Sequence, residues 1–251
     1  MEYSTDSVLN GKIKLVQPQN GYRVAIDPII LSSFVHPRRN QKILDVGCGV
    51  GTISLILKMK EISSEITALD VDKTMCEICR QNSAINSLHI NVINVGIENA
   101  KENLSLKNKL FDQIVTNPPF FSQKSSRISE TKRLANFETV NLSDWILFCF
   151  KKLKNEGIFS MIHKASRIDD ILYSLRGIAG SVQLIPIFPK INCEANRVVI
   201  IAKKSSKTET RILQGIVVHE DNGDYSKTMD EILSGKFLVD DVGKSKVKTL
   251  L

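Results

Sequence analysis

Short apolar segments alternate with helical patterns from Lys42 onward, and this alternation constrains the fold more than any other feature of the chain. Strands that alternate with helices form a mostly parallel sheet wrapped on both faces. Two later strands have no helix between them and are predicted to pair antiparallel at one edge. The predicted strands are 42–46, 65–69, 90–95, 111–116, 157–163, 182–188 and 197–202, and the predicted helices are 51–60, 73–86, 144–154 and 168–179. The sequence therefore predicts a doubly wound α/β fold with a seven-stranded sheet.

The N-terminal segment is predicted to add a small hairpin and a helix to this core. Asn10-Gly11 lies between apolar residues and predicts a hairpin, because both positions of such a turn need positive φ. A second turn is expected at 20–21. Asp27 is expected to cap a helix that starts at Pro28 and runs to about Val35.

The C-terminal segment is predicted to be an appendage rather than a second domain. It contains a strand at 212–218, a turn at 222–224 and a helix that Ser226 caps and Gly235 ends. Within the core, Ser143 is expected to cap the helix at 144–154 and Gly157 to close it. The chain is thus predicted to be one domain, 1–251, made of an N-terminal hairpin and helix (1–40), the core (41–204), the appendage (205–239) and a basic tail (240–251).

The charge balance points to a class of partner. The 251 residues include 34 Lys and Arg against 27 Asp and Glu, which gives a net charge of +7 and a pI near 9.1. This excess favours a polyanionic partner, and a solvated lysine-rich surface is the alternative. The chain does not open with a signal-like segment, and its longest apolar run, 145–150, is too short to span a bilayer. We therefore expect no membrane partner, and a monomer is favoured.

The cysteines and histidines give no sign of a metal site. Five cysteines, mostly in apolar patterns, are typical of a reduced, cytoplasmic protein. Cys76 and Cys79 are spaced as half of a metal site or a redox pair, but both fall on one face of a predicted helix and no second pair completes a site. Core packing is therefore favoured for them. The four histidines lack metal spacing, so no metal is assigned.

A glycine-rich turn follows the first core strand and opens the next helix. It reads Asp45-Val46-Gly47-Cys48-Gly49-Val50-Gly51. Glycines let the backbone turn tightly and approach a ligand, and the helix N-terminus offers free N–H groups. The Asp45 carboxylate would repel a pyrophosphate but attract a cationic ligand end. Asp70, at the end of the next strand, is placed to bind both hydroxyls of a ribose. A purely structural turn and a solvated or helix-capping acid are the alternatives.

The sequence Asn117-Pro118-Pro119-Phe120 follows the fourth core strand. Two successive prolines remove two backbone donors and fix φ, so the strand stops and a rigid loop begins. The loop presents an Asn amide and backbone carbonyls directly before an aromatic ring. This arrangement suits a planar amine, and a proline-stiffened turn is the alternative.

The glycine loop and Asp70 resemble those of the class I S-adenosylmethionine-dependent methyltransferases, whose fold is Rossmann-like. The Asn-Pro-Pro-aromatic turn is similar to the motif of members that methylate an amino group conjugated to a planar system. The resemblance implies that Asn117 and the Pro118 carbonyl accept the amine hydrogens and that Phe120 stacks on the base, beside Pro119. It further implies that the cofactor is S-adenosylmethionine, held by Asp45, Gly47, Cys48, Gly49, Gly51, Asp70 and Val71.

Adenine recognition departs from this pattern. Such enzymes commonly carry an acid after the third strand that binds the adenine amino group, but Gly96 stands at that position. Glu98 or the backbone of Ile97 is expected to serve instead. Gly96 is also the one argument for a noncatalytic RNA-binding scaffold.

Two flanking motifs narrow the resemblance. Gly21-Tyr22-Arg23 with Ile26-Asp27 and Ile30-Leu31, and Asp221 with 223–226, resemble the bacterial tRNA1(Val) adenine-N6-methyltransferase family. That family implies transfer of a methyl group to the adenine 3′ of the anticodon in tRNA. Arg23 and Asp27 would then lie beside the cofactor methionine and the target base. Other planar amines, namely guanine N2 in rRNA and protein glutamine, remain alternatives.

The segment after the Asn117 turn is long, polar and mostly basic. It carries Lys124, Arg127, Lys132 and Arg133. A basic loop beside the catalytic turn is expected to contact RNA and help hold a flipped-out base. A solvated loop is the alternative.

Overall fold

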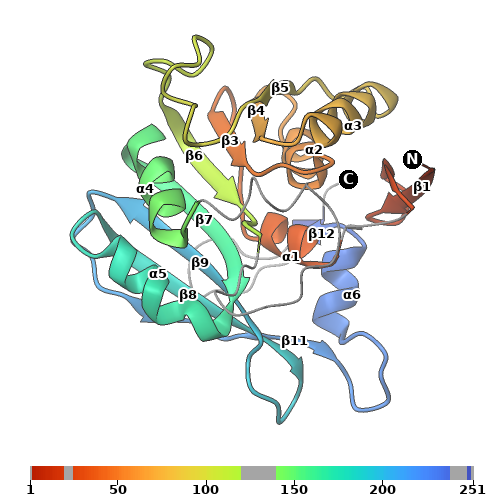
Figure 1. The fold of residues 1–251 in the computed structure, drawn as a ribbon. Coiled ribbons are helices and arrows are strands. Elements are labelled where there is room, and N and C mark those ends of the chain that lie inside the picture. Colours follow the sequence, from red (N-terminus) through yellow and green to blue (C-terminus); the bar gives the residue numbers. More distant parts are fainter. Residues whose placement is uncertain (1, 20–24, 120–139, 238–247, 250–251) are drawn as a thin grey trace, which may run out of the picture.

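The computed structural model describes residues 2–19, 25–119, 140–237 and 248–249 (Figure 1). Its central sheet has the strand order β10-β8-β9-β7-β6-β3-β4-β5, and β11 also pairs with β8. The strands are β3 (Lys42–Val46), β4 (Glu65–Asp70), β5 (Asn91–Asn94), β6 (Phe111–Thr116), β7 (Leu153–Lys164), β8 (Ala179–Lys190), β9 (Arg197–Lys204), β10 (Arg211–Ile212) and β11 (Ile216–His219). Strands β5, β4, β3, β6 and β7 run parallel, whereas β9 is antiparallel to both β7 and β8. The predicted α/β fold with its antiparallel pair is confirmed.

The sheet is wider than the sequence predicted. The single strand expected at 212–218 is instead two short strands, β10 and β11, and both pair in parallel with β8. The interruption lies opposite Pro186, which has no amide hydrogen to donate to a neighbour. The appendage strand therefore extends the main sheet to nine strands, and β8 is not an edge.

Helices cover both faces of the sheet. They are α1 (Asp27–Ser33), α2 (Thr52–Lys60), α3 (Lys73–Ile85), α4 (Leu142–Lys152), α5 (Ile168–Leu175) and α6 (Lys227–Leu233), with a 3₁₀ turn at Ala165–Arg167. Successive residues of a strand point to opposite faces. Accordingly, Ile43 packs in the core that includes α1 and α2, and Leu44 packs in the core that includes α4 and α5 (Figure 1). This arrangement is the doubly wound one.

Three helix boundaries differ from the sequence predictions. The cap of α4 is Asn141, whose Oδ1 accepts from the Asp144 amide at 2.8 Å, and not Ser143. Helix α4 ends at Lys152 and β7 begins at the next residue, so Gly157 lies inside that strand. Helix α5 ends at Leu175 because β8 already begins at Ala179. By contrast, Ser226 caps α6 as predicted, accepting from the Met229 amide at 3.1 Å.

Asp27 does not cap α1. The helix begins at Asp27 with Ile26 as the N-cap residue and no side-chain capping bond, and Pro28 lies in its first turn. The Asp27 carboxylate instead accepts a hydrogen bond from Arg197 Nε at 3.1 Å. The Asp27 carboxylate is thus used in an ion pair with β9 and not in a local cap.

The N-terminal hairpin is present, and side chains of α3 and of the α3 C-cap bond the second strand of the hairpin to the core. Strands β1 (Tyr3–Val8) and β2 (Ile13–Pro18) pair antiparallel, and Asn10 and Gly11 both have positive φ. The buried Asn82 of α3 accepts from the Val16 amide at 2.7 Å and donates to the Val16 and Val50 carbonyls at 2.9 Å each. The hairpin is therefore tied to the glycine-rich turn.

The C-terminal end of the described chain forms a second small sheet. Strand β12 (Lys236–Phe237) pairs antiparallel with β13 (Lys248–Thr249), so two residues of the predicted tail lie in a strand. The rest of the predicted tail and the turn expected at 20–21 lie outside the described residues. No helix in the described ranges is long and apolar enough to cross a membrane.

Candidate active site

Three predicted features meet at the carboxyl ends of β3, β4 and β6. Val46 of β3 lies in register with Leu69 of β4 and with Thr116 of β6. The glycine-rich turn, Asp70 and Asn117 follow these positions directly, so they lie side by side at one edge of the sheet. Strand order reverses at β3, and ligands of open α/β sheets bind outside the carboxyl ends of strands at such a point.

The glycines of the turn meet two different needs. Gly47, Gly49 and Gly51 have φ of 75°, 53° and 90°, which is the left-handed region that favours glycine. A Cβ on Gly51 would also lie 2.5 Å from Cys79 Sγ, so that position has no room for a side chain. A Cβ on Gly49 would meet no described atom within 4 Å. The backbone at Gly49 thus borders open space, as a ligand-binding turn requires.

Asp70 ends β4 with its carboxylate almost fully buried. One oxygen accepts from the Gly49 amide at 2.8 Å and the other from the Asp72 amide at 2.9 Å. Burial raises the pKa of Asp70, and these two amide bonds oppose that rise. Each carboxylate oxygen can accept more than one hydrogen bond, so both keep capacity for ligand hydroxyls. Val71 follows it, half-buried, and Asp72 caps α3.

Asp45 is a completely buried acid beneath the turn. Its Oδ2 accepts from the Ser54 hydroxyl at 2.7 Å and from the Ser54 amide at 3.1 Å. Its Oδ1 and the nearby Thr52 Oγ1 are buried without a hydrogen-bond partner among the described residues. Burial raises the pKa of Asp45 to about 7, opposed by the bonds to Ser54. Buried polar atoms without a partner are rare in proteins, and a bound water, ion or functional role accounts for them.

Cys48 of the turn and Cys76 and Cys79 of α3 are three buried thiols. Interaction with Cys76 and Cys79, together with burial, raises the pKa of Cys48. All three cysteines are free thiols, so Cys76 and Cys79 pack in the interior in the manner expected of core residues. No group of three or more His, Cys, Asp or Glu within the described ranges could hold a metal ion.

An acid stands over Gly96 despite the missing side chain there. A Cβ built on Gly96 would overlap the carboxylate of Glu98, so that carboxylate fills the space that a side chain at position 96 would take. Ile97 is buried in the core, which leaves its backbone rather than its side chain for any ligand contact. The structure therefore offers Glu98 as the acid on this side of the site.

Asn117 begins the turn that follows β6. Its side-chain Oδ1 is buried and has no hydrogen-bond partner among the described residues. Pro118 is buried and Pro119 is half-buried, so the turn is packed against the protein. The preceding Thr116 has a buried hydroxyl that donates to the Val46 carbonyl at 2.7 Å. The turn thus holds a rigid, unsatisfied amide oxygen beside the glycine-rich turn.

Two further charged or titratable groups lie at this edge and were not predicted from the sequence. Arg197, at the start of β9, pairs with Asp27, and no local pattern relates residues so far apart in the chain. His163, near the end of β7, is buried, and burial lowers its pKa to about 4, with help from neighbouring cations. His163 is therefore neutral near pH 7 and cannot supply a charge there.

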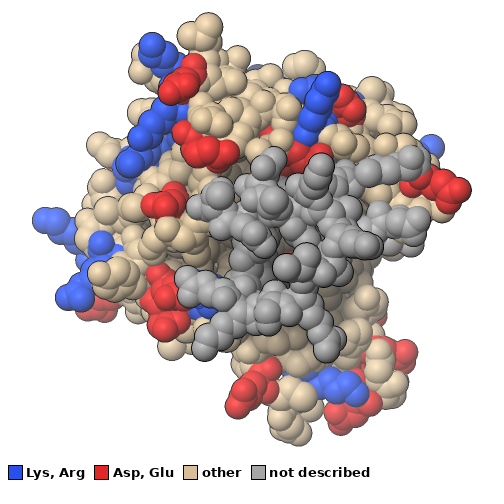
Figure 2. Space-filling model, viewed as in Figure 1, with Lys and Arg blue, Asp and Glu red and all other residues tan. Residues whose placement is uncertain are grey.

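Several predicted site residues lie outside the described part of the chain. These are Arg23, Phe120, Lys124, Arg127, Lys132 and Arg133. On the face shown in Figure 2, basic and acidic side chains are interspersed around the undescribed residues, without a continuous basic patch among the described ones. The expected RNA-contacting loop stays a prediction.

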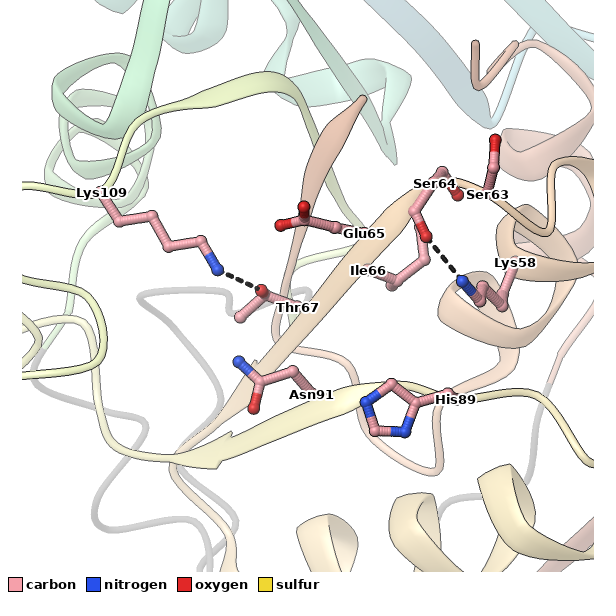
Figure 3. Close-up of a pocket in the computed structure, with 9 residues that line it drawn as sticks. All are labelled: Lys58, Ser63, Ser64, Glu65, Ile66, Thr67, His89, Asn91 and Lys109. Carbon is pink, nitrogen blue, oxygen red and sulfur yellow. Dashed lines mark hydrogen bonds between the residues drawn. The ribbon is translucent and has the colours of Figure 1, made fainter. Parts of the chain in front are cut away.

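A cavity of about 340 Å³ lies away from these residues. It borders the amino-terminal ends of β4 and β5 (Figure 3). Asp70 lies at the other end of β4. Lys58 Nζ donates to the Ser64 carbonyl at 2.6 Å, and Lys109 Nζ donates to Thr67 Oγ1 at 3.4 Å. These lysines are already bonded to the protein, and the cavity lacks the orphaned buried atoms of the edge described above.

Comparisons with known proteins agree with this geometry. The methyltransferase small domain family matches residues 27–142. A tRNA1(Val) (adenine(37)-N6)-methyltransferase from Shewanella baltica is 24% identical over 226 residues, which cover 87% of this chain and 93% of that protein. One of the same name from Parabacteroides distasonis is 32% identical over 142 residues, or 56% of this chain and 59% of that protein. A solved predicted O-methyltransferase from Agrobacterium tumefaciens shares the fold with a TM-score of 0.68 at 20% identity, covering 83% of this chain and 96% of its own.

Proposed function

Because this chain is an S-adenosylmethionine-dependent methyltransferase with a methyltransferase small domain, we propose that it methylates N6 of an adenine in tRNA. The names of its relatives support this substrate, because relatives that align over most of the chain are named tRNA1(Val) (adenine(37)-N6)-methyltransferases. The net charge of +7 suits a nucleic-acid partner. A tRNA substrate would place the enzyme in the cytoplasm.

The buried Oδ1 of Asn117, which has no hydrogen-bond partner among the described residues, carries the proposal. Leaving such an acceptor unsatisfied is unfavourable, so the site is built to receive an N–H donor. The exocyclic amine of adenine is a poor nucleophile because its lone pair is delocalised into the ring. When Asn117 Oδ1 and the Pro118 carbonyl accept its two hydrogens, the nitrogen becomes more pyramidal and its lone pair is directed for attack. The gain comes from orientation and electrostatics, and no strong base is needed.

The residues around the glycine-rich turn fit the methyl donor. The orphaned atoms of Asp45 and Thr52 and the open space at Gly49 lie where the turn meets α2. Asp45 suits a cationic amino group and Asp70 suits ribose hydroxyls. Glu98 is the candidate for the adenine amino group. When bound, S-adenosylmethionine supplies an electrophilic methyl group on a positively charged sulfur.

Incubation of the protein with labelled S-adenosylmethionine and bulk tRNA, followed by nucleoside analysis, tests the proposal. The expected product is N6-methyladenosine. Label in N2-methylguanosine, or in glutamine of a protein fraction treated in parallel, would assign a different planar amine to the same site. The absence of N6-methyladenosine from every tRNA pool tried would overturn the proposal, and calorimetry with S-adenosylmethionine would then show whether the cofactor still binds.

A further inference from the structure

Trp145 lies in the first turn of α4 and is hydrogen-bonded to β6, the strand that directly precedes Asn117. Its indole Nε1–H donates to Thr116 Oγ1 at 2.9 Å, and Thr116 Oγ1 in turn donates to the Val46 carbonyl at 2.7 Å. Val46 is the last residue of β3, directly before Gly47. A continuous chain of two buried hydrogen bonds therefore runs from α4 through the end of β6 to the start of the glycine-rich turn.

The other side of the same indole contacts the glycine-rich turn. A Cβ on Gly47 would lie 3.1 Å from Trp145 Cζ2 and 3.2 Å from the adjacent ring carbon. The indole thus occupies the space against which Gly47 rests, and it is 8% exposed. The position cannot take a side chain without moving the ring. One rigid side chain consequently contacts both the turn assigned to the methyl donor and the residue that precedes Asn117.

We propose that Trp145 is a positioning residue that fixes the spacing between the glycine-rich turn and the Asn117 turn. The indole packs in a hydrophobic core cluster. Its two directed contacts add a second role that burial does not require. The inference rests on the proposed function, because the spacing matters for bringing a methyl donor and an amine together.

The physical reason for such a residue is geometric. Methyl transfer needs the nucleophile and the methyl group within a near-attack distance, and a displacement of about 1 Å can slow a reaction about 100-fold. An indole has only two side-chain torsions, so it holds its contacts with little loss of conformational freedom. Movement of Gly47 on ligand binding must shift the indole or be resisted by it. A shift of the indole is passed to Thr116 through the Nε1–H bond, whereas resistance keeps Gly47 and Thr116 at a fixed spacing.

The indole itself provides a readout that does not depend on activity. Trp145 is the sole tryptophan of the chain, so intrinsic fluorescence reports on this position alone. Titration with S-adenosylhomocysteine is expected to change the emission saturably, with the dissociation constant that calorimetry gives. Calorimetric binding without any change in emission would overturn the proposal, because the indole would then be insensitive to the occupied turn.

Substitution of Thr116 separates positioning from packing. Thr116→Val removes the hydroxyl at nearly constant volume and is expected to lower kcat about tenfold or more, with S-adenosylmethionine affinity retained. Thr116→Ser keeps the hydroxyl and should keep kcat close to that of the wild type. If Thr116→Val does not fold, Trp145→Phe tests the same bond, since it keeps a ring against Gly47 but lacks the N–H. Unchanged kcat in a folded variant would overturn the proposal.

The two proposals fail in different ways. A wild-type protein that methylates no tRNA contradicts the proposed substrate, and the fluorescence titration still tests the contact between Trp145 and the turn. A wild-type protein that is active, with variants that lose cofactor affinity and keep kcat, contradicts the positioning role and leaves the substrate assignment intact.

Discussion

The carboxylate of Asp70 accepts a hydrogen bond from the amide of Gly49 at 2.8 Å, so the end of β4 holds the middle of the glycine-rich turn. The turn has positive φ at Gly49 and would otherwise be free to take other conformations. The acid that we assign to the cofactor ribose therefore also shapes the turn that receives the cofactor. A substitution at Asp70 should disturb both.

Replacement of Asp70 by alanine is expected to weaken S-adenosylmethionine binding about 10- to 100-fold. A hydrogen bond to a charged group contributes roughly 1.5–3 kcal/mol, and 1.4 kcal/mol corresponds to a factor of ten. Isothermal titration calorimetry measures the change. Asp72→Ala is the matched control, because its side chain caps α3 through the Thr74 and Met75 amides. The control should lose about 1 kcal/mol of stability and keep its affinity. Equal affinity loss in both variants would contradict the ribose assignment.

Alanine at Gly49 should mainly lower cofactor affinity, whereas alanine at Gly51 should mainly lower the free energy of unfolding. Both positions have positive φ, which an alanine adopts at a cost of roughly 1–2 kcal/mol. At Gly49 the added methyl meets no described atom, so it should project into the space assigned to the cofactor and lower S-adenosylmethionine affinity. At Gly51 the methyl would collide with Cys79 Sγ, so the free energy of unfolding should fall by a further 1–3 kcal/mol or so.

Thermal unfolding and calorimetry distinguish these two outcomes. Cys79→Ala in the Gly51→Ala background should recover part of the lost stability, because it removes the colliding sulfur. A Gly49→Ala variant that binds the cofactor as tightly as the wild type would show that the open space beside Gly49 is not the cofactor site. Failure of Cys79→Ala to recover any stability would show that strain in φ alone accounts for the Gly51 effect.

The buried acid Asp45 should make stability fall as pH rises from about 4 to about 7. Its pKa is about 7 in the folded protein against an ordinary value of 3.8, so the folded state keeps a proton that the unfolded chain has lost in this window. Stability falls with pH wherever the unfolded state binds fewer protons, and the shift corresponds to ~4 kcal/mol across the window. Asp45→Asn removes this dependence of stability on pH.

Urea unfolding of wild type and Asp45→Asn at pH 5 and pH 8 measures the difference. The wild type should lose more stability than the variant between the two pH values, because the variant has no carboxyl to ionise at that position. Parallel losses in the two proteins would mean that Asp45 ionises in the folded state with an ordinary pKa. Ser54→Ala, which removes one of the bonds that favour the carboxylate, should enlarge the loss in the wild-type background.

The core strands could be predicted closely because local signals agree there. Strands β3 and β6 were predicted to the residue, since each is an apolar run that ends at a strong breaker, glycine in one case and two prolines in the other. The prediction of Ser143 as the cap of α4 was wrong, because Asn141 is also a capping residue type and lies only two positions away. Only the three-dimensional path of the chain decides which side chain reaches an open amide.

The contacts that complete the site could not be predicted from local pattern. Asp27 and Arg197 pair across 170 residues, and the same local sequence fits a helix cap equally well. The bond from Trp145 to Thr116 likewise depends on how α4 packs against β6. Motif spacing singled out Asp70 and Asn117 as candidates, whereas the geometry between them comes from tertiary packing, to which a single sequence gives no signal.

Removal of the Asn117 side chain should abolish methyl transfer and leave cofactor binding intact. Its buried Oδ1 is the acceptor that we propose for the target amine, and loss of one oriented group in such a site lowers kcat on the order of 100-fold or more. Asn117→Asp keeps an oxygen acceptor and should retain part of the activity lost in Asn117→Ala. Asn141→Ala, which removes the cap of α4, controls for lost stability and should stay active. Labelled transfer to tRNA and calorimetry with S-adenosylhomocysteine measure the two properties separately. Normal turnover in Asn117→Ala would show that Asn117 does not receive the amine. Loss of both cofactor binding and turnover would show the same.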